Sequence, residues 1–286
     1  MVQGRTKSYT CLLGGGKQMK IGNREFDVLH HTYVMGILNV TPDSFSDGGR
    51  FQQLDLALAH TEQMIREGAA IIDVGGESTR PGHVQISDEE EIHRVVPVIE
   101  AIRQRFDIPI SLDTYKSAVA RAGIAAGADL LNDIWGLKYD PELAPLIAET
   151  GVACCLMHNR DHTEYRSFLS DMLDDLRESV CIAKAAGISN DRIVLDPGVG
   201  FGKTYEQNLI VMNHLEQLKD LGYPVLLGTS RKSVIGQTLD VPAMERTAGT
   251  VATTVFGVQK GCAFVRVHDV KENLHAIKMT EAILHS

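Results

Sequence analysis

The chain has 286 residues, of which 44% are hydrophobic and 23% charged, and its formal net charge is -9. This acidic balance opposes a nucleic-acid-binding protein, because a phosphate backbone normally selects a basic stripe on its partner. No apolar run approaches the length of about 18 residues that a membrane span requires. We therefore expect a globular protein whose partners include neither nucleic acid nor membrane.

The N-terminal segment, MVQGRTKSYTCLLGGGKQ, has no continuous apolar core of signal-peptide length. Its GGGKQ stretch lacks the earlier glycine and the Ser/Thr of a phosphate-binding P-loop. We expect residues 1–20 to be an accessory or poorly ordered lead-in and residues 21–286 to form a single domain. No CxxC pair is present, which predicts reduced thiols and a cytoplasmic protein. The cysteines are Cys11, Cys154, Cys155, Cys181 and Cys262.

After a hairpin predicted around Gly22 and Asn23, short apolar runs rich in β-branched residues recur along the chain. They mostly lack polar alternation, as strands buried on both faces do. The runs span residues 33–39, 69–76, 108–113, 129–133, 151–158, 192–196, 224–230 and 263–267. Helical patterns lie between most of them, and this alternation predicts a parallel sheet.

Two architectures fit this pattern, a closed (β/α)8 barrel and an open doubly wound sheet. Eight strands within about 250 residues favour the (β/α)8 TIM barrel, here preceded by a short N-terminal hairpin. Polar residues stand where the predicted strands end, and only closure of a barrel brings the first end beside the eighth. These residues are Asn39, Glu77 to Arg80, Asp113, Asn132 with Asp133, His158 with Asn159, Asp196, Ser230 to Lys232, and Arg266 with His268.

Asp113 and Asp196 each have two readings, because an aspartate at a strand-to-loop junction is also a common helix N-cap. The DPGVGFGKT stretch favours a ligand-binding role for Asp196, since its glycines allow close approach and no helix follows at once. A carboxylate there would pair two N–H donors of a planar, guanidine-like ring edge, and the amide of Asn132 would complete that edge. We interpret His158 as a structural histidine, and no histidine spacing predicts a zinc site.

The stretches GTSRKS (228–233) and RVHD (266–269) follow the last two predicted strands, where phosphate sites commonly form in barrels. Arg266 and His268 share one face of an extended segment, directed toward Ser230 and Lys232. This combination predicts a phosphate or pyrophosphate site. Phe201 has two open readings, a packed aromatic or a side chain that flanks a flat substrate.

Eight motifs in this order resemble the dihydropteroate synthase family of bacterial folate synthesis. They are MGILNVTPDSFSDGG, GGESTRPG, SLDTYK, NDIWG, LMHNR, LDPGVGFGKT, LLGTSRKS and FVRVHDV. The resemblance runs from about residue 33 to the C-terminus. It implies a sulfonamide-targeted enzyme that condenses 6-hydroxymethyl-7,8-dihydropterin diphosphate with 4-aminobenzoate, releasing pyrophosphate and 7,8-dihydropteroate. It also implies Mg²⁺ as cofactor and a homodimer, for which the small-residue-rich segment 244–261 offers a partner helix or a deeply packed one.

The resemblance assigns roles to individual residues of this sequence. The pterin would be held by Asp113, Asn132, Asp196 and Lys232. Asn39 would help to hold Mg²⁺, and the diphosphate would contact Arg266 and His268. The 4-aminobenzoate would be bordered by Thr79, Pro81, Phe201, Lys232 and Ser233. The residues closest to the chemistry would be Lys232, Arg266, His268 and Asp113.

Asp47 and Arg80 are expected on two loops, residues 41–50 and 78–84, that close over the site when diphosphate is bound. Glycines and prolines without a hydrophobic period leave little burial to offset the entropy of ordering such loops. Two other functions remain as alternatives. One is a methyltetrahydrofolate-dependent corrinoid methyltransferase, which needs no cationic site for a leaving diphosphate, and the other is a pterin-binding module without turnover.

Overall fold

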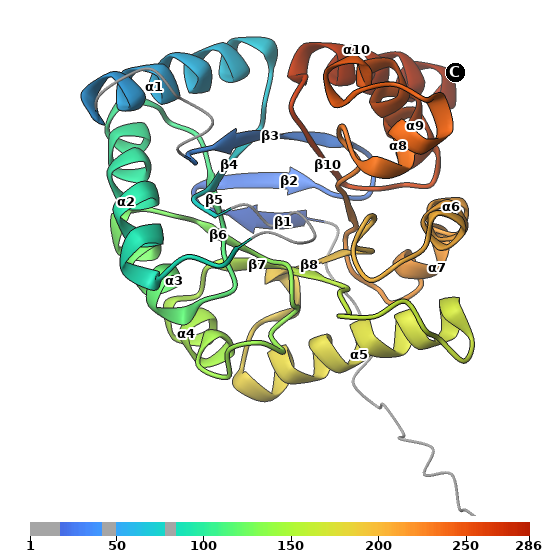
Figure 1. The fold of residues 1–286 in the computed structure, drawn as a ribbon, viewed down its shortest axis with the longest axis horizontal. Coiled ribbons are helices and arrows are strands. Elements are labelled where there is room, and N and C mark those ends of the chain that lie inside the picture. The colour runs from blue at the N-terminus through green and yellow to red at the C-terminus, as the bar shows by residue number, and fades with distance from the viewer. Residues whose placement is uncertain (1–17, 42–49, 78–83) are drawn as a thin grey trace, which may run out of the picture.

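Eight parallel strands form a barrel ringed by helices in the computed structural model, which describes residues 18–41, 50–77 and 84–286 (Figure 1). The sheet order is β8-β7-β6-β5-β4-β3-β10-β9, and a parallel bridge between Leu195 and Val225 joins the two ends. The strands are β3 Tyr33–Asn39, β4 Ile71–Gly75, β5 Ile110–Asp113, β6 Leu130–Asp133, β7 Ala153–Met157, β8 Ile193–Asp196, β9 Leu226–Leu227 and β10 Phe264–Val267. The predicted TIM barrel is confirmed, and the doubly wound alternative is wrong.

The helices lie outside the strands and cover the barrel (Figure 1). They are α1 Arg50–Glu67, α2 Asp88–Arg105, α3 Ser117–Ala126, α4 Leu143–Thr150, α5 Phe168–Ala186, α6 Tyr205–Asn213, α7 Glu216–Lys219, α8 Ser233–Leu239, α9 Thr247–Gln259 and α10 Val270–Leu284. Side-chain caps mark the starts of two of these helices. Ser87 accepts the Glu90 N–H at the start of α2, and Thr204 forms a capping box with Gln207 at the start of α6.

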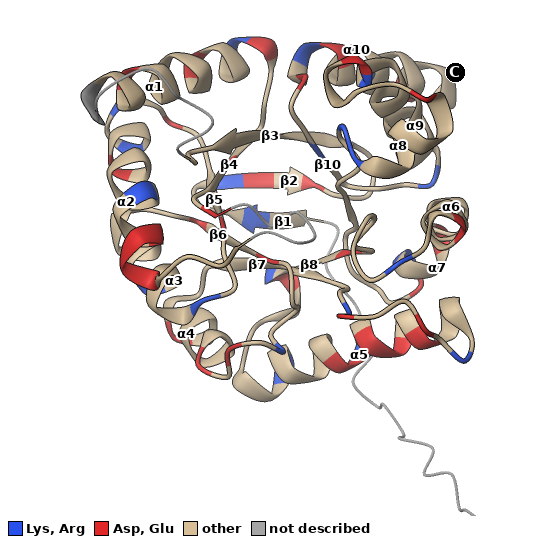
Figure 2. Ribbon diagram, in the orientation of Figure 1, with Lys and Arg blue, Asp and Glu red and all other residues tan. Residues whose placement is uncertain are grey.

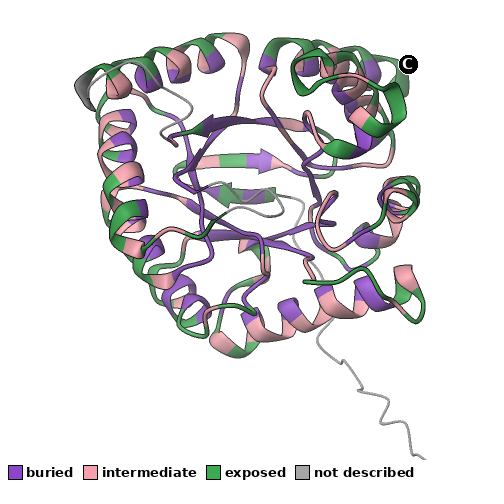
Figure 3. Ribbon diagram, in the orientation of Figure 1, coloured by how far each residue is buried: buried purple, intermediate pink, exposed green. Residues whose placement is uncertain are grey.

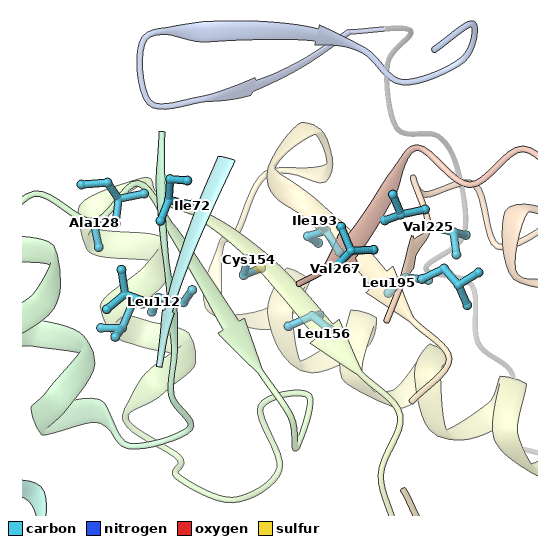
Figure 4. Packing of buried hydrophobic residues seen from close by; sticks show 14 of the residues in the cluster. Ile72, Leu112, Ala128, Cys154, Leu156, Ile193, Leu195, Val225 and Val267 are labelled. Atoms are coloured by element: carbon cyan, nitrogen blue, oxygen red, sulfur yellow. The ribbon is translucent and has the colours of Figure 1, made fainter. Parts of the chain in front are cut away.

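Side chains along each strand alternate between the helices and the barrel interior. Cys154 packs in the large outer cluster together with residues of the helices, whereas the adjacent Cys155 belongs to an inner cluster. Figure 4 shows other members of the outer cluster, among them Ile72, Leu112 and Leu195. This alternation explains why the runs are apolar throughout, since both faces of each strand are buried (Figure 3).

The inner cluster fills the end of the barrel where the strands begin, and the N-terminal hairpin packs against it. The hairpin consists of β1 Gln18–Ile21 and β2 Arg24–Asp27, which pair antiparallel as predicted. Met19, Ile21 and Phe26 are buried with Phe264, and the rings of Phe26 and Phe264 lie 5.6 Å apart. Because this end is closed by apolar packing, a polar site has room only at the opposite end, where the strands finish.

Charged residues gather on the outer helices, with acidic stretches on α2 and α5 (Figure 2). Among the described residues, no helix is both long enough and apolar enough to cross a membrane. Cys154, Cys155 and Cys262 are buried free thiols.

Candidate active site

The inward positions become polar beyond the apolar inner cluster. Asp73 and Arg266 occupy the middle of their strands, and Asp113, Asn132 and Asp196 lie near the strand ends. The four uncharged or acidic side chains among these are at most 6% exposed. The carboxyl ends of parallel strands meet at one rim, so residues from distant parts of the sequence come together there.

Arg266 is bound between two carboxylates inside the barrel. Its Nε donates to Asp73 Oδ2 at 2.6 Å and its Nη2 donates to Asp113 Oδ2 at 2.7 Å. Ser111 Oγ donates to the other oxygen of Asp73. Nearby negative charge keeps the pKa of Arg266 above its ordinary value despite its burial. Asp73 was not among the predicted site residues. The feature of the sequence that could have identified it is a carboxylate in the middle of the apolar run 69–76.

Asp113 has one carboxylate oxygen without a partner. Oδ2 accepts the hydrogen bond from Arg266, whereas Oδ1 is buried and has no hydrogen-bond partner among the described residues. Burial raises the pKa of Asp113 to about 7, against the opposing charge of Arg266. The N-cap reading is wrong, because α3 begins at Ser117 with Lys116 as its N-cap. A buried oxygen of this kind needs a donor, which a bound ligand can supply.

Neighbouring strands align Asp113 with two predicted site residues. It pairs in register with Asn132 on one side and with Gly75 on the other, and Gly75 pairs with Asn39. A Cβ at Gly75 would lie 3.6 Å from the Cβ of Asp113 and 3.8 Å from Asn39 Oδ1. The glycine therefore lets both side chains approach the same space. Asn39 itself is exposed at the end of β3.

Asp196 begins a glycine-rich loop, as the sequence predicted. Its Oδ1 accepts the Gly198 N–H at 2.7 Å, and no helix starts until Tyr205, so it is not an N-cap. Gly198 has a φ of +66°, in the left-handed region that favours glycine, and a Cβ there would lie 1.9 Å from the His158 carbonyl oxygen. Burial raises the pKa of Asp196, with the charge of Lys232 as the main opposing influence.

Lys232 reaches across to this loop. Its Nζ donates to the Val199 carbonyl and lies 4.5 Å from the ring centroid of Phe201, a cation–π contact. Burial lowers the pKa of Lys232 to about 8, although Asp196 opposes that shift. Phe201 itself packs on a small apolar cluster of Tyr115, Ile134 and Met157. The site thus offers a flat apolar wall beside charged groups.

His268 and Ser230 meet as the sequence predicted. Ser230 Oγ lies 2.9 Å from His268 Nδ1 and accepts the His268 backbone N–H at 3.1 Å. Arg231, between Ser230 and Lys232, instead pairs with Asp269 at 2.6 Å. Ser233 is exposed at the start of α8. The cations near the site are therefore Lys232 and Arg266, with His268 held by Ser230, whereas Arg231 is engaged by Asp269.

Several predictions lie outside the described residues and are not placed by the structure. The residues are Asp47, Thr79, Arg80 and Pro81. The expected closure of loops 41–50 and 78–84 falls there as well, except for residues 41, 50 and 84. Within the described ranges, no group of three or more His, Cys, Asp or Glu side chains forms a metal cluster.

A closed (β/α)8 barrel with an unpartnered buried carboxylate oxygen and nearby cationic groups at its C-terminal rim is an enzyme architecture for a small polar substrate. The chain matches the pterin binding enzyme family over residues 35–268. It is 61% identical over 267 residues to the dihydropteroate synthase of Clostridium beijerinckii, covering 93% of this chain and 99% of that protein.

Two solved structures are also similar. Clostridium difficile dihydropteroate synthase in the presence of pteroic acid is 52% identical with a TM-score of 0.89, covering 91% of this chain and 100% of that one. A Yersinia pestis dihydropteroate synthase–sulfonamide complex is 42% identical with a TM-score of 0.88, covering 94% and 100%. The chain belongs to the pterin-binding enzyme family and, within it, to the dihydropteroate synthases, transferases of folate biosynthesis that sulfonamides target. The predicted family resemblance is confirmed, and the alternative of a corrinoid methyltransferase is wrong.

Proposed function

We propose that this chain condenses 6-hydroxymethyl-7,8-dihydropterin diphosphate with 4-aminobenzoate at the barrel rim, using the residues described above. The unpartnered Oδ1 of buried Asp113 carries this assignment, because it calls for an N–H donor from a bound ligand. The 2-amino and N3 hydrogens of a pterin form a two-donor edge that suits a second carboxylate, Asp196. Asn132 adds an amide that both donates and accepts, so the buried set matches the mixed edges of the ring.

Lys232 and Phe201 form the boundary between the two substrates in this proposal. The Lys232 ammonium lies beside the Phe201 ring. Burial lowers its pKa, and the negative charges of Asp196 and Asp113 oppose that shift. An ammonium in this place attracts the electron-rich pterin ring and the developing negative charge of the leaving group. The Phe201 face then supports the ring of 4-aminobenzoate, with Ser233 at the exposed side.

The proposed reaction breaks the bond between the pterin CH2 and the diphosphate oxygen and forms a C–N bond. Pyrophosphate leaves with the electron pair, and the amine proton passes to water. An aniline nitrogen is a nucleophile at neutral pH, so no strong general base is required. Catalysis therefore comes from holding the amine in line with the CH2 and from neutralising the leaving group.

His268 and Ser230 are the proposed contacts of the leaving diphosphate, with Arg266 behind them. Asp73 and Asp113 offset the charge of Arg266, so the imidazole of His268 and the hydroxyl of Ser230 are the nearer hydrogen-bonding groups for this task. Mg²⁺ would add charge neutralisation when it binds with the diphosphate. The exposed Asn39 amide oxygen fits such an ion, because magnesium usually keeps several waters and takes few protein ligands beside substrate phosphates.

Purified protein with Mg²⁺ is expected to release pyrophosphate only when pterin diphosphate and 4-aminobenzoate are both present. Sulfonamides should compete with 4-aminobenzoate, whose arylamine and anionic end they copy, and not with the pterin substrate. A coupled pyrophosphate assay with each component omitted in turn measures both effects. Saturable pterin binding with no pyrophosphate release would indicate a binding module instead.

We also propose a homodimer formed by the α8–α10 side of the barrel. Exposed large apolar side chains of the described residues concentrate there. They are Leu239, Met244, Phe256, Met279, Ile283 and Leu284. A cavity of about 280 Å³ between α6 and α9, lined by Leu209, Met212 and Phe256 among others, adds apolar surface on this side. Such a surface favours a second copy of the chain over solvent.

The variant Met279→Lys/Ile283→Lys should be a monomer, whereas the unaltered chain should have twice its 31.3 kDa mass by sedimentation velocity. These side chains are 62% and 61% exposed, so lysine disturbs an interface without disturbing the core. Leu29→Lys, at a 54% exposed position in the turn after β2, is the matched control and should remain dimeric. A monomeric unaltered chain would contradict the proposal.

We infer a cytoplasmic location, which the free thiols of Cys154, Cys155 and Cys262 support.

A further inference from the structure

We propose that Lys203 is a positioning residue of this active site, which holds the loop of residues 198–202 against both substrates. The inference rests on the proposed function. Lys203 lies at the end of the glycine-rich loop that follows β8 and is 9% exposed. Among the described residues, its side-chain hydrogen bonds go to His158 and to two backbone carbonyls, so its effect on the substrates passes through the backbone of this loop.

The Lys203 ammonium uses all three of its hydrogens inside the protein. Nζ lies 2.7 Å from His158 Nδ1, and it donates to the carbonyls of Gly198 and Phe201 at 3.0 Å each. Two of these contacts tie the first and fourth residues of the loop to one cation. The third ties the loop to His158 at the end of β7, so the loop is fastened to the barrel wall.

Asp175 on α5 sets the ring of His158 for this contact. Its Oδ2 lies 3.1 Å from His158 Nε2 and also accepts from Arg160 Nε at 2.6 Å. Nε2 must therefore carry the hydrogen, which leaves Nδ1 as an acceptor for Lys203. Burial, with the nearby Lys203 charge, lowers the pKa of His158 to about 4, so a neutral imidazole is the form that accepts. His158 is thus structural, as predicted from the sequence.

The loop held by Lys203 carries the groups that the pterin and arylamine would meet. The N–H of Gly198 donates to the Asp196 carboxylate, and the carbonyl of Val199 accepts from Lys232. Phe201 supplies the ring beside the Lys232 ammonium. A shift of the loop therefore moves the Asp196 carboxylate, the Lys232 ammonium and the aromatic wall together. The Ser230–His268 pair is built on other strand ends and is independent of the loop.

Burying an ammonium group costs free energy, whereas apolar side chains can anchor a loop without that cost. The three hydrogen bonds of Lys203 require the two loop carbonyls and the His158 ring to lie in fixed directions around Nζ, so they specify one loop conformation. Apolar packing has no such directional requirement. The cation is surrounded by charges of both signs. Those that face it are Asp196, Asp175, Lys232, Arg160 and the neutral His158. Burial is the largest influence and lowers the pKa of Lys203 to about 7.

Lys203→Met keeps the length of the side chain and removes the hydrogen bonds. We expect the dissociation constant of free pterin to rise about tenfold or more, as loss of charged hydrogen bonds predicts. The KM for 4-aminobenzoate should rise with it. The affinity for pyrophosphate should fall by a much smaller factor than the affinity for pterin, because Ser230 and His268 do not depend on the loop and only Lys232 is shared between the two ligands. Calorimetry with free pterin and with pyrophosphate, each with Mg²⁺, measures this difference.

Lys138→Met is the matched control. Lys138 Nζ donates to the backbone carbonyl of Asp175 at 2.8 Å, so the exchange disturbs the same neighbourhood without touching the loop, and pterin affinity should be unchanged. Asp175→Ala provides a second approach if Lys203→Met fails to fold. This change removes the acceptor that holds the hydrogen on His158 Nε2, and alanine is well tolerated within helix α5. It should also weaken pterin binding, but by a smaller factor than Lys203→Met.

The pH profile separates positioning from a general loss of structure. A neutral amine has two hydrogens for three acceptors, so the ratio of pterin affinities between the unaltered chain and Lys203→Met should fall toward one as pH rises through about 7. The ratio is the quantity compared, because Asp113 and Lys232 titrate over the same range in both proteins. A folded Lys203→Met protein with unchanged pterin affinity would overturn the inference. Equal loss of pterin and pyrophosphate affinity would also overturn it. Failure of the proposed function would instead appear as an unaltered chain that releases no pyrophosphate.

Discussion

Asp196→Asn should weaken the binding of free pterin by about 2 kcal/mol or more while the fold survives. The Gly198 N–H now donates to Asp196 Oδ1, and it would keep the oxygen of an asparagine amide in that place. The amide nitrogen then faces the hydrogens of the pterin edge, so two donors meet where a donor and an acceptor met before. Calorimetric titration of free pterin into the folded variant measures the loss directly.

Asp161→Asn is the matched control, because its side chain is 85% exposed and lies on the surface after β7. It should leave pterin affinity unchanged. Far-ultraviolet circular dichroism confirms that both variants keep the barrel. If the folded Asp196→Asn protein binds pterin as tightly as the unaltered chain, Asp196 only shapes the glycine-rich loop and the proposed pterin site is wrong.

Arg266→Met should destabilise the protein by about 3–5 kcal/mol, which urea unfolding detects. The guanidinium is the ion-pair partner of Asp73 at 2.6 Å and of Asp113 at 2.7 Å, and both carboxylates are buried. Its removal leaves both carboxylates without their ion-pair partner in the barrel interior. Arg177→Met, which breaks a partly exposed pair with Asp174, is the matched control and should change stability by less than about 1 kcal/mol.

The destabilisation should depend on pH with a definite sign. Burial already raises the pKa of Asp113 to about 7 while Arg266 opposes the shift, so loss of Arg266 raises it further. A carboxyl whose folded pKa exceeds the unfolded value of about 4 loses stability as pH rises through the folded value. The defect of Arg266→Met should therefore shrink toward pH 4 and grow toward pH 8. Adding Asp73→Asn should recover part of the stability at neutral pH, and a defect independent of both changes would contradict this account.

These two variants also distinguish two kinds of site residue. Asp196 offers its second oxygen to the space beside Gly228, where a Cβ would lie 3.6 Å from it. Arg266 has its Nε and Nη2 engaged by protein carboxylates before any ligand arrives. A variant at Asp196 thus reports on ligand contact. A variant at Arg266 reports first on the integrity of the barrel interior, although the sequence assigned it to the diphosphate alone.

The sequence alone was sufficient to predict the barrel and most of its rim. Strands such as residues 33–39 are apolar on both faces, and this local pattern predicts a parallel strand whatever its neighbours are. The glycine-rich loop after Asp196 and the polar residues at the other strand ends were visible for the same reason, since strand ends are marked by local composition. Family motifs then supplied roles for these positions.

Only the tertiary structure decided which of these residues hold one another. Arg266 meets Asp73 across 193 positions and Asp113 across 153, and Lys203 meets His158 across 45. Local periodicity states that a side chain faces inward, but not which inward side chain lies opposite, because that depends on strand order, register and closure of the barrel. For the same reason an aspartate at a strand end looked equally like an N-cap until the start of the next helix was placed. The partners of these buried charges are a property of the closed barrel, because no single segment of the chain contains both members of a pair.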